Sequence, residues 1–454
     1  MNRARRAFLV LLTLDVLAVL VVFNLVGLTY LSGTPVGVRF ILTPLLVPLL
    51  IHVVAIYLID GYSRGTDMMS LDYTSQHSIA LLTAMATTLL LTFAVFPGGY
   101  ELQSSRVVVA LSYLLLIPVT LVYRRALYRA TLRRRGRRSL VFLGDHESYH
   151  AFRNECERLG AVQPLVFASL HPVEGGNEPV AQFADVLDRI QSGDLRVEAI
   201  VLRESNHELA PDVSRKLVQL YFSGVPTYTL ELFHQVYWRK IPLYRLNQTW
   251  LFQEGFQIAR EPVFERAKRV ADVVLSLIGL FVAAPFILVG ATAIWLEDRG
   301  PVFFRQNRVG KNHVTFRLHK LRTMRVSDQP GDLYTQPGDA RITRVGKILR
   351  QTRVDEFPQL WNVLRGDMSL IGPRAEWDRL VENYEQTIPC YHFRHLVKPG
   401  ITGWAQVNYP YGASTEDTIR KLEYDLYYIR HFSFMLDASI VLKTIHIMLF
   451  GKGR

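Results

Sequence analysis

The stretch DVVLSLIGLFVAAPFILVGATAIWLED occupies residues 272–298 and decides how the chain is organised. It is long enough to cross a hydrocarbon core of about 30 Å, yet Pro285 lies near its middle. A proline there removes a backbone donor and clashes with the preceding turn, so the helix should kink or break. Basic residues flank both ends, and a straight span would export one of the two groups. We therefore predict a re-entrant membrane helix over residues 262–298, broken at Pro285, with both ends on one side of the bilayer.

Four further apolar runs precede this stretch, each of about 20 residues and so of membrane-spanning length. They predict a four-helix transmembrane bundle over residues 1–123, with spans near 8–31, 39–59, 77–96 and 104–123. Arginines cluster before the first run and again in 124–137, which we interpret as a basic juxtamembrane linker. Because basic residues accumulate on the cytoplasmic side, both ends of the bundle are predicted to face the cytoplasm.

The first apolar run contains one carboxylate, Asp15, which is costly inside a bilayer unless it is paired. Two interpretations stay open: a functional group, or a polar contact between helices or near the membrane boundary. The net charge of +12 indicates an anionic partner, and the position of the arginines favours lipid headgroups. No basic groove with interleaved aromatic residues points to nucleic acid. With only two cysteines, Cys156 and Cys390, neither a disulfide framework nor a cysteine metal site is expected.

Residues 138–250 have the alternating pattern of an α/β module, which predicts an open Rossmann-like sheet. Strands are predicted at SLVFLGD (139–145), EAIVLRE (198–204) and VPTYTL (225–230), and helices at 147–159 and 211–223. The first strand runs into LGDHES, with one glycine where a dinucleotide-binding turn needs three. We therefore expect a structural or regulatory module that does not bind a dinucleotide.

The remainder, residues 299–454, is polar and rich in arginine, and we predict a mostly helical catalytic domain there. Its last part, residues 421–450, alternates charged and large apolar positions. That pattern fits amphipathic helices, either packed in a core or lying at a membrane interface.

Two adjacent carboxylates, Asp355 and Glu356, stand among arginines in RVDEFPQLWNVLRGDMSLIGPR (353–374). Guanidinium forks suit phosphate oxygens, and neighbouring cations favour ionised carboxylates, so both groups are expected to be charged. An ionised aspartate can attack phosphorus, and an adjacent carboxylate can hold Mg²⁺. Pro358 places the pair near the start of a helix, whose positive end also favours anions. The alternative is structural: the pair caps that helix and bonds the arginines.

From about residue 262 to 454 the chain closely resembles the bacterial sugar transferases, also called polyprenyl-phosphate hexose-1-phosphate transferases or monotopic phosphoglycosyl transferases. The matching segments are KRVADVVLSLIGL (268–280), GPVFFRQNRVGKNHVTFRLHKLRTM (300–324), RITRVGKILRQTRVDEFPQLWNVLRGDMSLIGPR (341–374), VKPGITGWAQVN (397–408) and LEYDLYYI (422–429). Four spans followed by an α/β module resemble the larger members, which act as undecaprenyl-phosphate glucose or galactose phosphotransferases. The chain departs from the family pattern in having Ala284 before Pro285 and GPRAEW after residue 371.

The resemblance implies roles for individual residues. Asp355 matches the nucleophile that carries the phosphosugar, and Glu356 matches its partner associated with Mg²⁺, so both are metal-site candidates. Basic positions expected near phosphate groups are matched by Lys320, Arg322, Arg350 and Arg374. Gln406 and Asn408 match a segment that shapes the nucleotide end of the pocket.

The function implied is the transfer of hexose-1-phosphate from a UDP-sugar to undecaprenyl phosphate, with release of UMP, as the first membrane step of exopolysaccharide, capsule or O-antigen assembly. The enzyme would be a multi-pass protein of the bacterial inner membrane with its site facing the cytoplasm, and a homodimer is a candidate assembly. The sugar stays undetermined. Two alternatives are a membrane-tethered nucleotide-sugar oxidoreductase or dehydratase, which the single glycine disfavours, and a non-catalytic scaffold for polysaccharide assembly.

Overall fold

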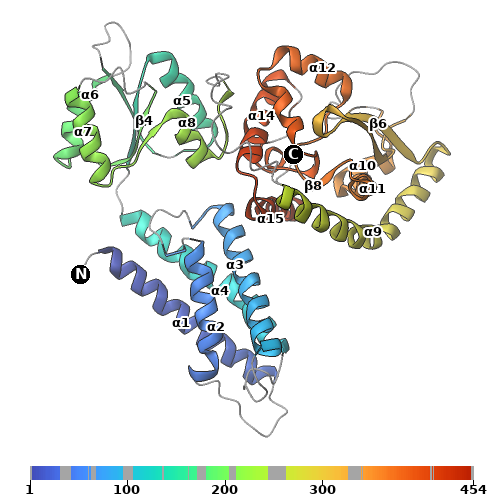
Figure 1. Cartoon of the computed structure of the whole chain (residues 1–454), viewed down its shortest axis with the longest axis horizontal. Helices are drawn as coiled ribbons and strands as arrows, with labels where there is room; N and C mark the ends of the chain where they lie inside the picture. The colour runs from blue at the N-terminus through green and yellow to red at the C-terminus, as the bar shows by residue number, and fades with distance from the viewer. Residues whose placement is uncertain are drawn as a thin grey trace. The chain divides into compact units, whose positions relative to one another are not determined.

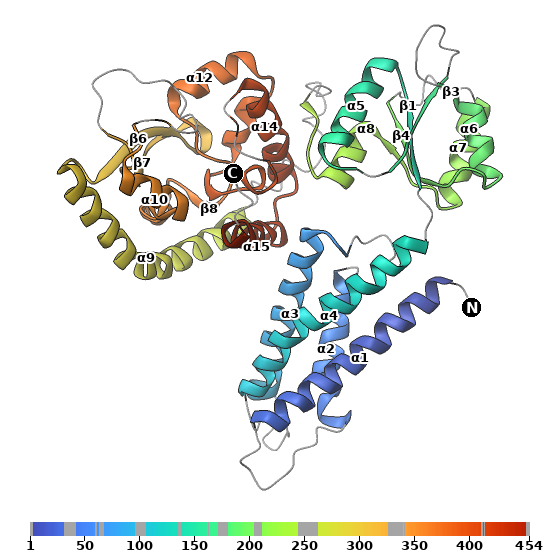
Figure 2. The same ribbon diagram turned by 180° about the vertical axis from the view of Figure 1, so that it is seen from behind.

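A computed structural model gives the structure of the chain, which divides into two units, Met1–Gly136 and Arg137–Arg454 (Figures 1 and 2). The structure describes residues 3–30, 42–59, 61–62, 68–95, 106–134, 138–161, 163–170, 180–203, 211–243, 262–325, 339, 341–409, 412 and 414–450. Parts of the predicted spans 8–31, 39–59, 77–96 and 104–123, of the linker 124–137 and of the strand 198–204 lie outside these residues.

The first unit is a bundle of apolar helices: α1 (Arg3–Tyr30), α2 (Leu42–Leu58), α3 (Leu71–Leu90) with the π-helical turn η1 (Leu91–Val95), and α4 (Arg106–Arg134). Helices α1, α3 with η1, and α4 are long and apolar enough to cross a membrane, whereas α2 is a shorter apolar helix. The segment expected to be a linker is largely helical, because α4 continues to Arg134. Large apolar side chains such as Leu50 and Val122 are exposed on the bundle surface, as suits a lipid environment.

The bundle encloses a buried ion pair between its first and last helices. Arg124 donates to the Asp15 carboxylate over 2.5 Å, and both side chains are fully buried. Tyr62, at 2.6 Å, and Tyr123 also donate to this carboxylate. Asp15 is therefore an interhelical polar contact, one of the two interpretations that its sequence position left open.

The second unit begins with a five-stranded parallel sheet in the order β3-β2-β1-β4-β5, the arrangement of a Rossmann-like half. Its strands are β1 (Ser139–Leu143), β2 (Leu165–Ser169), β3 (Ala181–Gln182), β4 (Val197–Leu202) and β5 (Thr227–Thr229). Helices α6 (Phe183–Gln191) and α7 (Pro211–Phe222) cover one face, and α5 (His146–Arg158) and α8 (Leu230–Phe233) cover the other (Figure 1). The predicted Rossmann-like sheet is confirmed, although β2, β3 and α6 were not predicted.

The turn after β1 places a carboxylate where a dinucleotide-binding fold would place a pyrophosphate. Asp145 caps α5 by accepting a 2.8 Å hydrogen bond from the backbone N–H of Ser148, and Arg203 pairs with the same carboxylate. The side chain thus occupies the anion-binding end of the helix. This cap is the local reason why α5 starts at His146.

Helix α9 (Pro262–Asp298) is apolar and long enough to span a membrane. The prediction of a break at Pro285 is wrong, since the helix is continuous through that residue, but both views draw α9 as a bent ribbon. A proline can bend a helix without ending it when the surrounding turns keep their hydrogen bonds. One side of α9 packs closely through Gly279 and Gly290 against Leu360 and Leu321. Another side exposes large residues, among them Phe281 at 84%.

The rest of the unit is mostly helical and packs around this helix. It contains an antiparallel hairpin, several short helices and a two-stranded parallel sheet. The elements are β6 (Phe303–Val309), η8 (Lys311–His313), β7 (Thr315–Leu321), α10 (Arg344–Thr352), η9 (Val354–Glu356), α11 (Gln359–Arg365), β8 (Ser369–Ile371), α12 (Asp378–Thr387), η10 (Tyr391–Leu396), β9 (Gly400–Thr402), α13 (Trp404–Asn408), α14 (Thr415–Arg430) and α15 (Phe434–Phe450). Of the two C-terminal helices, α14 lies in the core, while α15 also exposes apolar residues such as Phe434.

The sheet module and the helical part share one buried lysine. Lys240, which follows the π-helical turn η4 (His234–Trp238), pairs with Glu155 of α5 and with Glu423 of α14, the second at 2.9 Å. All three side chains are at most 7% exposed. Glu423 also accepts from the backbone N–H of Leu243, so its carboxylate is tied to the module by two bonds.

Candidate active site

The acidic pair sits in a tight turn between two helices. Arg353 ends α10 in the left-handed conformation (φ 57°), which turns the chain into the 3₁₀ helix η9 that carries Asp355 and Glu356. Helix α11 starts three residues after Glu356, so the predicted position near a helix start is confirmed. Residues of β7, α9 and α10 pack against η9. The pair is thus held by three different elements and does not lie on a free loop.

Cations surround Glu356 rather than Asp355. Lys320 of β7 donates a 2.8 Å hydrogen bond to Glu356 Oε1, and Arg374 approaches the same oxygen at 3.8 Å. Arg353 approaches the other oxygen, Oε2, at 3.9 Å. Within the described residues, no side chain donates a hydrogen bond to the Asp355 carboxylate. The two neighbouring carboxylates therefore differ in their environment.

This difference separates their proton affinities. Burial alone would raise the pKa of Glu356, but Lys320 and Arg374 outweigh it and lower that pKa to about 2. For Asp355 the balance is reversed: burial, together with the adjacent Glu356, raises the pKa although Lys320 and Arg350 oppose it. Cations favour the ionised form of both groups, as expected, but at Asp355 burial and Glu356 outweigh them, whereas at Glu356 the cations prevail. Burial also lowers the pKa of Lys320, against the effect of Glu356.

The other predicted phosphate-binding residues take different positions. Arg350 of α10 donates to the Thr323 hydroxyl at 2.9 Å, and its charge acts on Asp355. Arg322 turns away and pairs with Asp298 at the end of α9. The structure therefore brings Lys320, Arg350 and Arg374 to the acidic pair, whereas Arg322 contacts a different carboxylate.

Gln406 and Asn408 lie on α13, where their side chains serve local contacts. Gln406 donates to the Ile401 carbonyl at 3.1 Å, and Asn408 donates to the Trp404 carbonyl at 2.8 Å. Asn408 also accepts a 2.9 Å hydrogen bond from Lys443. The side-chain oxygen of Gln406 is buried without a partner among the described residues. Neither residue contacts the acidic pair.

Two residues that hold the site in place were not predicted from the sequence. Asn362 is fully buried on α11; its oxygen accepts from the His319 backbone N–H at 3.1 Å and its nitrogen donates to the Arg317 carbonyl at 2.8 Å. It therefore fixes α11 to the strand that carries Lys320. Arg308 of β6 donates to the Ala375 carbonyl at 3.1 Å, next to Arg374. Its position in the basic strand FRQNRVG was the available sequence signal.

The donor set fits a magnesium ion. Mg²⁺ is usually bound by one or two carboxylates, with water and substrate phosphates completing its octahedral shell. Asp355 and Glu356 supply two adjacent carboxylates, and the Asp355 oxygens receive no side-chain hydrogen bond within the described part of the chain. The pair matches that incomplete donor set, in which phosphates must supply the remaining ligands.

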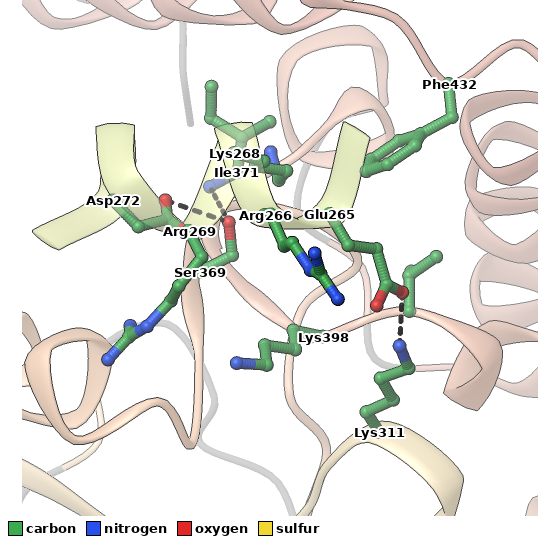
Figure 3. Close-up of a pocket in the computed structure, with 11 residues that line it drawn as sticks. Glu265, Arg266, Lys268, Arg269, Asp272, Lys311, Ser369, Ile371, Lys398 and Phe432 are labelled. Carbon is green, nitrogen blue, oxygen red and sulfur yellow. Dashed lines mark hydrogen bonds and ion pairs between the residues drawn. The ribbon is translucent and has the colours of Figure 1, made fainter. Parts of the chain in front are cut away.

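A separate cavity of about 300 Å³ lies near the beginning of α9 and is lined by charged residues (Figure 3). Its lining includes Arg266, Arg269, Asp272 and Lys398 but neither residue of the acidic pair.

Comparison with known proteins identifies the helical part of the second unit. Residues 263–451 match the family described as "Bacterial sugar transferase". The chain is 40% identical over 269 residues to a UDP-N-acetylgalactosamine-undecaprenyl-phosphate N-acetylgalactosaminephosphotransferase of Aeromonas hydrophila. The matched residues are 59% of this chain and 63% of the relative. It is 44% identical over 191 residues to a UDP-glucose:undecaprenyl-phosphate glucose-1-phosphate transferase of Xanthomonas campestris pv. campestris. The matched residues are 41% of this chain and 40% of the relative. The chain thus spans less than two thirds of these two relatives.

A shorter relative is matched almost completely. The exopolysaccharide production protein PSS of Rhizobium leguminosarum bv. phaseoli is 42% identical over 194 residues, which are 41% of this chain and 97% of the relative. The shared region contains the hairpin, the acidic pair and the cations around it. Because this region matches both the family and nearly the whole of a relative, the chain belongs to the bacterial sugar transferase family.

Proposed function

We propose that the chain transfers a hexose-1-phosphate from a UDP-sugar to undecaprenyl phosphate and releases UMP. The observation that carries this proposal is the asymmetry of the acidic pair: Glu356 is held by Lys320 and two arginines, and the adjacent Asp355 carboxylate is left without a side-chain donor. The names of two relatives include a UDP-sugar donor and an undecaprenyl-phosphate acceptor, which supports the same substrates here.

In the first step, an Asp355 oxygen attacks the sugar-linked phosphorus of the UDP-sugar. A bond forms between this oxygen and phosphorus, and the bond from phosphorus to the UMP oxygen breaks, so UMP leaves with its electron pair. In the second step, an oxygen of undecaprenyl phosphate attacks the same phosphorus. The bond to Asp355 breaks, and the carboxylate is restored as the diphosphate-linked product leaves.

The surrounding cations provide the electrostatic stabilisation that phosphoryl transfer requires. Lys320 and Arg374 lie within 3.8 Å of one Glu356 oxygen, so an incoming phosphate meets positive charge beside the nucleophile. The charge of Arg350 also favours the ionised form of Asp355. A magnesium ion held by Asp355 and Glu356 would neutralise the diphosphate when bound.

The raised pKa of Asp355 has a functional consequence. A carboxylate whose charge is poorly compensated in the free protein gains from any cation or electrophile that arrives with the substrate. Glu356, in contrast, is already compensated and keeps its position. We assign nucleophilic attack to Asp355 for this reason.

We further propose that α9 is re-entrant and that the acidic pair faces the cytoplasmic side of the inner membrane. The bend of α9 and its exposed apolar residues support this arrangement, as do the basic residues near both ends of the helix. A site at that depth can receive a soluble nucleotide sugar and the headgroup of a membrane lipid.

The proposal is tested with full-length protein in detergent or nanodiscs, undecaprenyl phosphate, Mg²⁺ and a panel of UDP-glucose, UDP-galactose and UDP-N-acetylgalactosamine. UMP release with one of these donors, abolished in Asp355→Asn, is expected. A phosphosugar adduct on the Asp355 peptide, detected by mass spectrometry when the acceptor is omitted, would establish the covalent step. UMP release that survives Asp355→Asn would refute the mechanism.

A further inference from the structure

The cavity at the beginning of α9 is bordered by five cations that come from separate parts of the fold (Figure 3). Three of them lie on α9 itself, one in the turn of the hairpin and one just before β9. They are Arg266, Lys268, Arg269, Lys311 and Lys398, against the two carboxylates of Glu265 and Asp272. The lining therefore carries an excess of positive charge.

Three of these cations already have protein partners. Lys311 pairs with Glu265, and Lys268 pairs with Asp437 of α15. Arg269 donates to the carbonyl oxygens of Val363 and Leu364, at 2.5 Å and 2.6 Å, at the end of α11. These three cations therefore stabilise the fold through their protein partners.

Arg266 and Lys398 differ from the other three. Within the described residues, neither has a hydrogen-bond or ion-pair partner, although Lys398 is half-buried. Burial and the neighbouring Arg269 lower the pKa of Lys398, although the carboxylates of Asp272 and Glu265 act in the opposite direction. Both side chains border the cavity, and in Figure 3 the Arg266 guanidinium extends towards Glu265 while Lys398 extends towards the side of Arg269. Because Arg266 is exposed and Lys398 is half-buried, an anion arriving from the surface can reach both cations.

The surface of α9 beside the cavity tells which kind of anion fits. One turn further along the helix, Val270 and Val274 are 63% and 49% exposed, and the exposed apolar surface continues to Phe281. Apolar side chains that face lipid directly beside basic ones mark the level of the headgroups. The cavity volume of about 300 Å³ is at the lower limit of small-ligand sites and suits a phosphate group with a short polar substituent.

We propose that this cavity binds the phosphate headgroup of an anionic membrane lipid, with Arg266 and Lys398 as the binding residues. Arg269 and Lys311 add positive charge at its edges. The lipid would hold the start of α9 at the membrane surface. Ile371, Val397 and Phe432 form the apolar part of the lining.

The cavity is distinct from the proposed transfer site. Arg269 binds the carbonyls at the C-terminal end of α11, whereas the acidic pair precedes the N-terminal end of that helix. The seven residues of α11 span about 10 Å along the helix axis. The inference therefore goes beyond the proposed function and does not depend on it.

Native mass spectrometry of the full-length protein in detergent tests the proposal. The protein is titrated with phosphatidylglycerol or with zwitterionic phosphatidylcholine, and bound lipids are counted. We expect one phosphatidylglycerol to bind more tightly than any phosphatidylcholine. The double variant Arg266→Gln/Lys398→Gln should lose affinity for this lipid by at least about tenfold, because each Lys or Arg near an anionic headgroup strengthens binding several-fold. The control Arg379→Gln, on the exposed side of α12, should bind like the parent protein.

Two further arms fix the interpretation. Lys398→Arg keeps the charge and should retain the lipid, which excludes a general folding defect in the double variant. Inorganic phosphate is added as a competitor: displacement of phosphatidylglycerol shows that the cavity recognises the phosphate itself, and failure to displace it shows that the acyl chains contribute. Equal phosphatidylglycerol binding by the double variant and Arg379→Gln, or equal binding of the two lipids, would overturn the proposal. UMP release is measured separately and decides only the transfer reaction.

Discussion

Lys320 Nζ donates a 2.8 Å hydrogen bond to Glu356 Oε1, and this bond joins the hairpin to the turn that carries the acidic pair. The bond satisfies one carboxylate and leaves its neighbour Asp355 in a buried position without a side-chain donor. Two residues that look equivalent in the sequence therefore affect stability in opposite ways. Substitutions at the two positions are expected to change the free energy of unfolding at neutral pH in opposite directions.

Glu356→Gln should destabilise the protein at neutral pH. The folded-state pKa of about 2 lies below the ordinary 4.5, so the ionised group stabilises the fold above pH 4.5, and this contribution disappears as the pH falls towards 2. The shift corresponds to about 3 kcal/mol as an upper bound. Thermal unfolding followed by tryptophan fluorescence should show a lower midpoint for the variant at pH 7 and a smaller difference near pH 4. An unchanged midpoint at pH 7 would contradict the ion-pair assignment.

Asp355→Asn should behave in the opposite way. Because the folded state raises the pKa of this carboxyl, it binds the proton more tightly than the unfolded chain, and the ionised group costs stability at neutral pH. That cost disappears as the pH falls through the folded-state pKa. The variant is expected to keep or raise the unfolding midpoint at pH 7 while UMP release falls on the order of 10⁴-fold. A lower midpoint together with lost activity would indicate a structural role instead.

Lys320→Met should lower UMP release on the order of 100-fold, since it removes a preorganised cation next to the transferred phosphate. The matched control is Lys347→Met on the exposed side of α10, which should release UMP at the parental rate. Comparable losses in both variants would mean that the net charge of the region matters rather than the position of Lys320.

Lys240→Met should destabilise the second unit, because it removes the buried cation between Glu155 and Glu423. Arg158 still pairs with Glu155, and Arg420 lies 3.4 Å from Glu155 and 3.6 Å from Glu423, so the loss is partly compensated. Breaking a buried pair by removing one partner costs about 3–5 kcal/mol. Lys216→Met, at a half-exposed pair with Asp188, should cost less than about 1 kcal/mol. Chemical unfolding of the two variants, compared side by side, measures the difference; equal stabilities would refute the buried network.

The pair Asp15 and Arg124 should show strong coupling inside the transmembrane bundle. Each single variant, Asp15→Asn or Arg124→Gln, leaves a fully buried charge without this counter-ion, whereas the double variant removes both charges. A double-mutant cycle on thermal stability in detergent should give a coupling of about 1–3 kcal/mol. Additive effects would mean that the two side chains do not interact.

The sequence was sufficient to predict the apolar helices, the Rossmann-like module and the position of the acidic pair, because periodicity and turn residues report these features directly. It could not distinguish Asp355 from Glu356 in charge, since the pKa of each depends on burial and on β7, which is 34 residues away in the sequence. Nor did it show that α9 continues through Pro285, because the packing partners of that helix come from distant segments.

Arg322 illustrates how local spacing can mislead. Residues 320 and 322 are two apart, so a continuing strand would point both side chains to the same face. Strand β7 ends at Leu321, however, and the Arg322 side chain pairs with Asp298 at the end of α9 instead of with the acidic pair. The end of a strand is set by its tertiary neighbours, and the residue pattern alone did not reveal it.

The shared lysine at position 240 makes the family boundary a poor place to recombine these proteins. The family match begins at residue 263, so a chimera joined there would take Glu423 from one parent and Lys240 with Glu155 from the other. Unless the second parent supplied an equivalent carboxylate, Lys240 would keep Glu155 but lose its second carboxylate partner, and the Leu243 backbone N–H would lose this acceptor. In chimeras between relatives, residues 155, 240 and 423 should therefore come from the same parent.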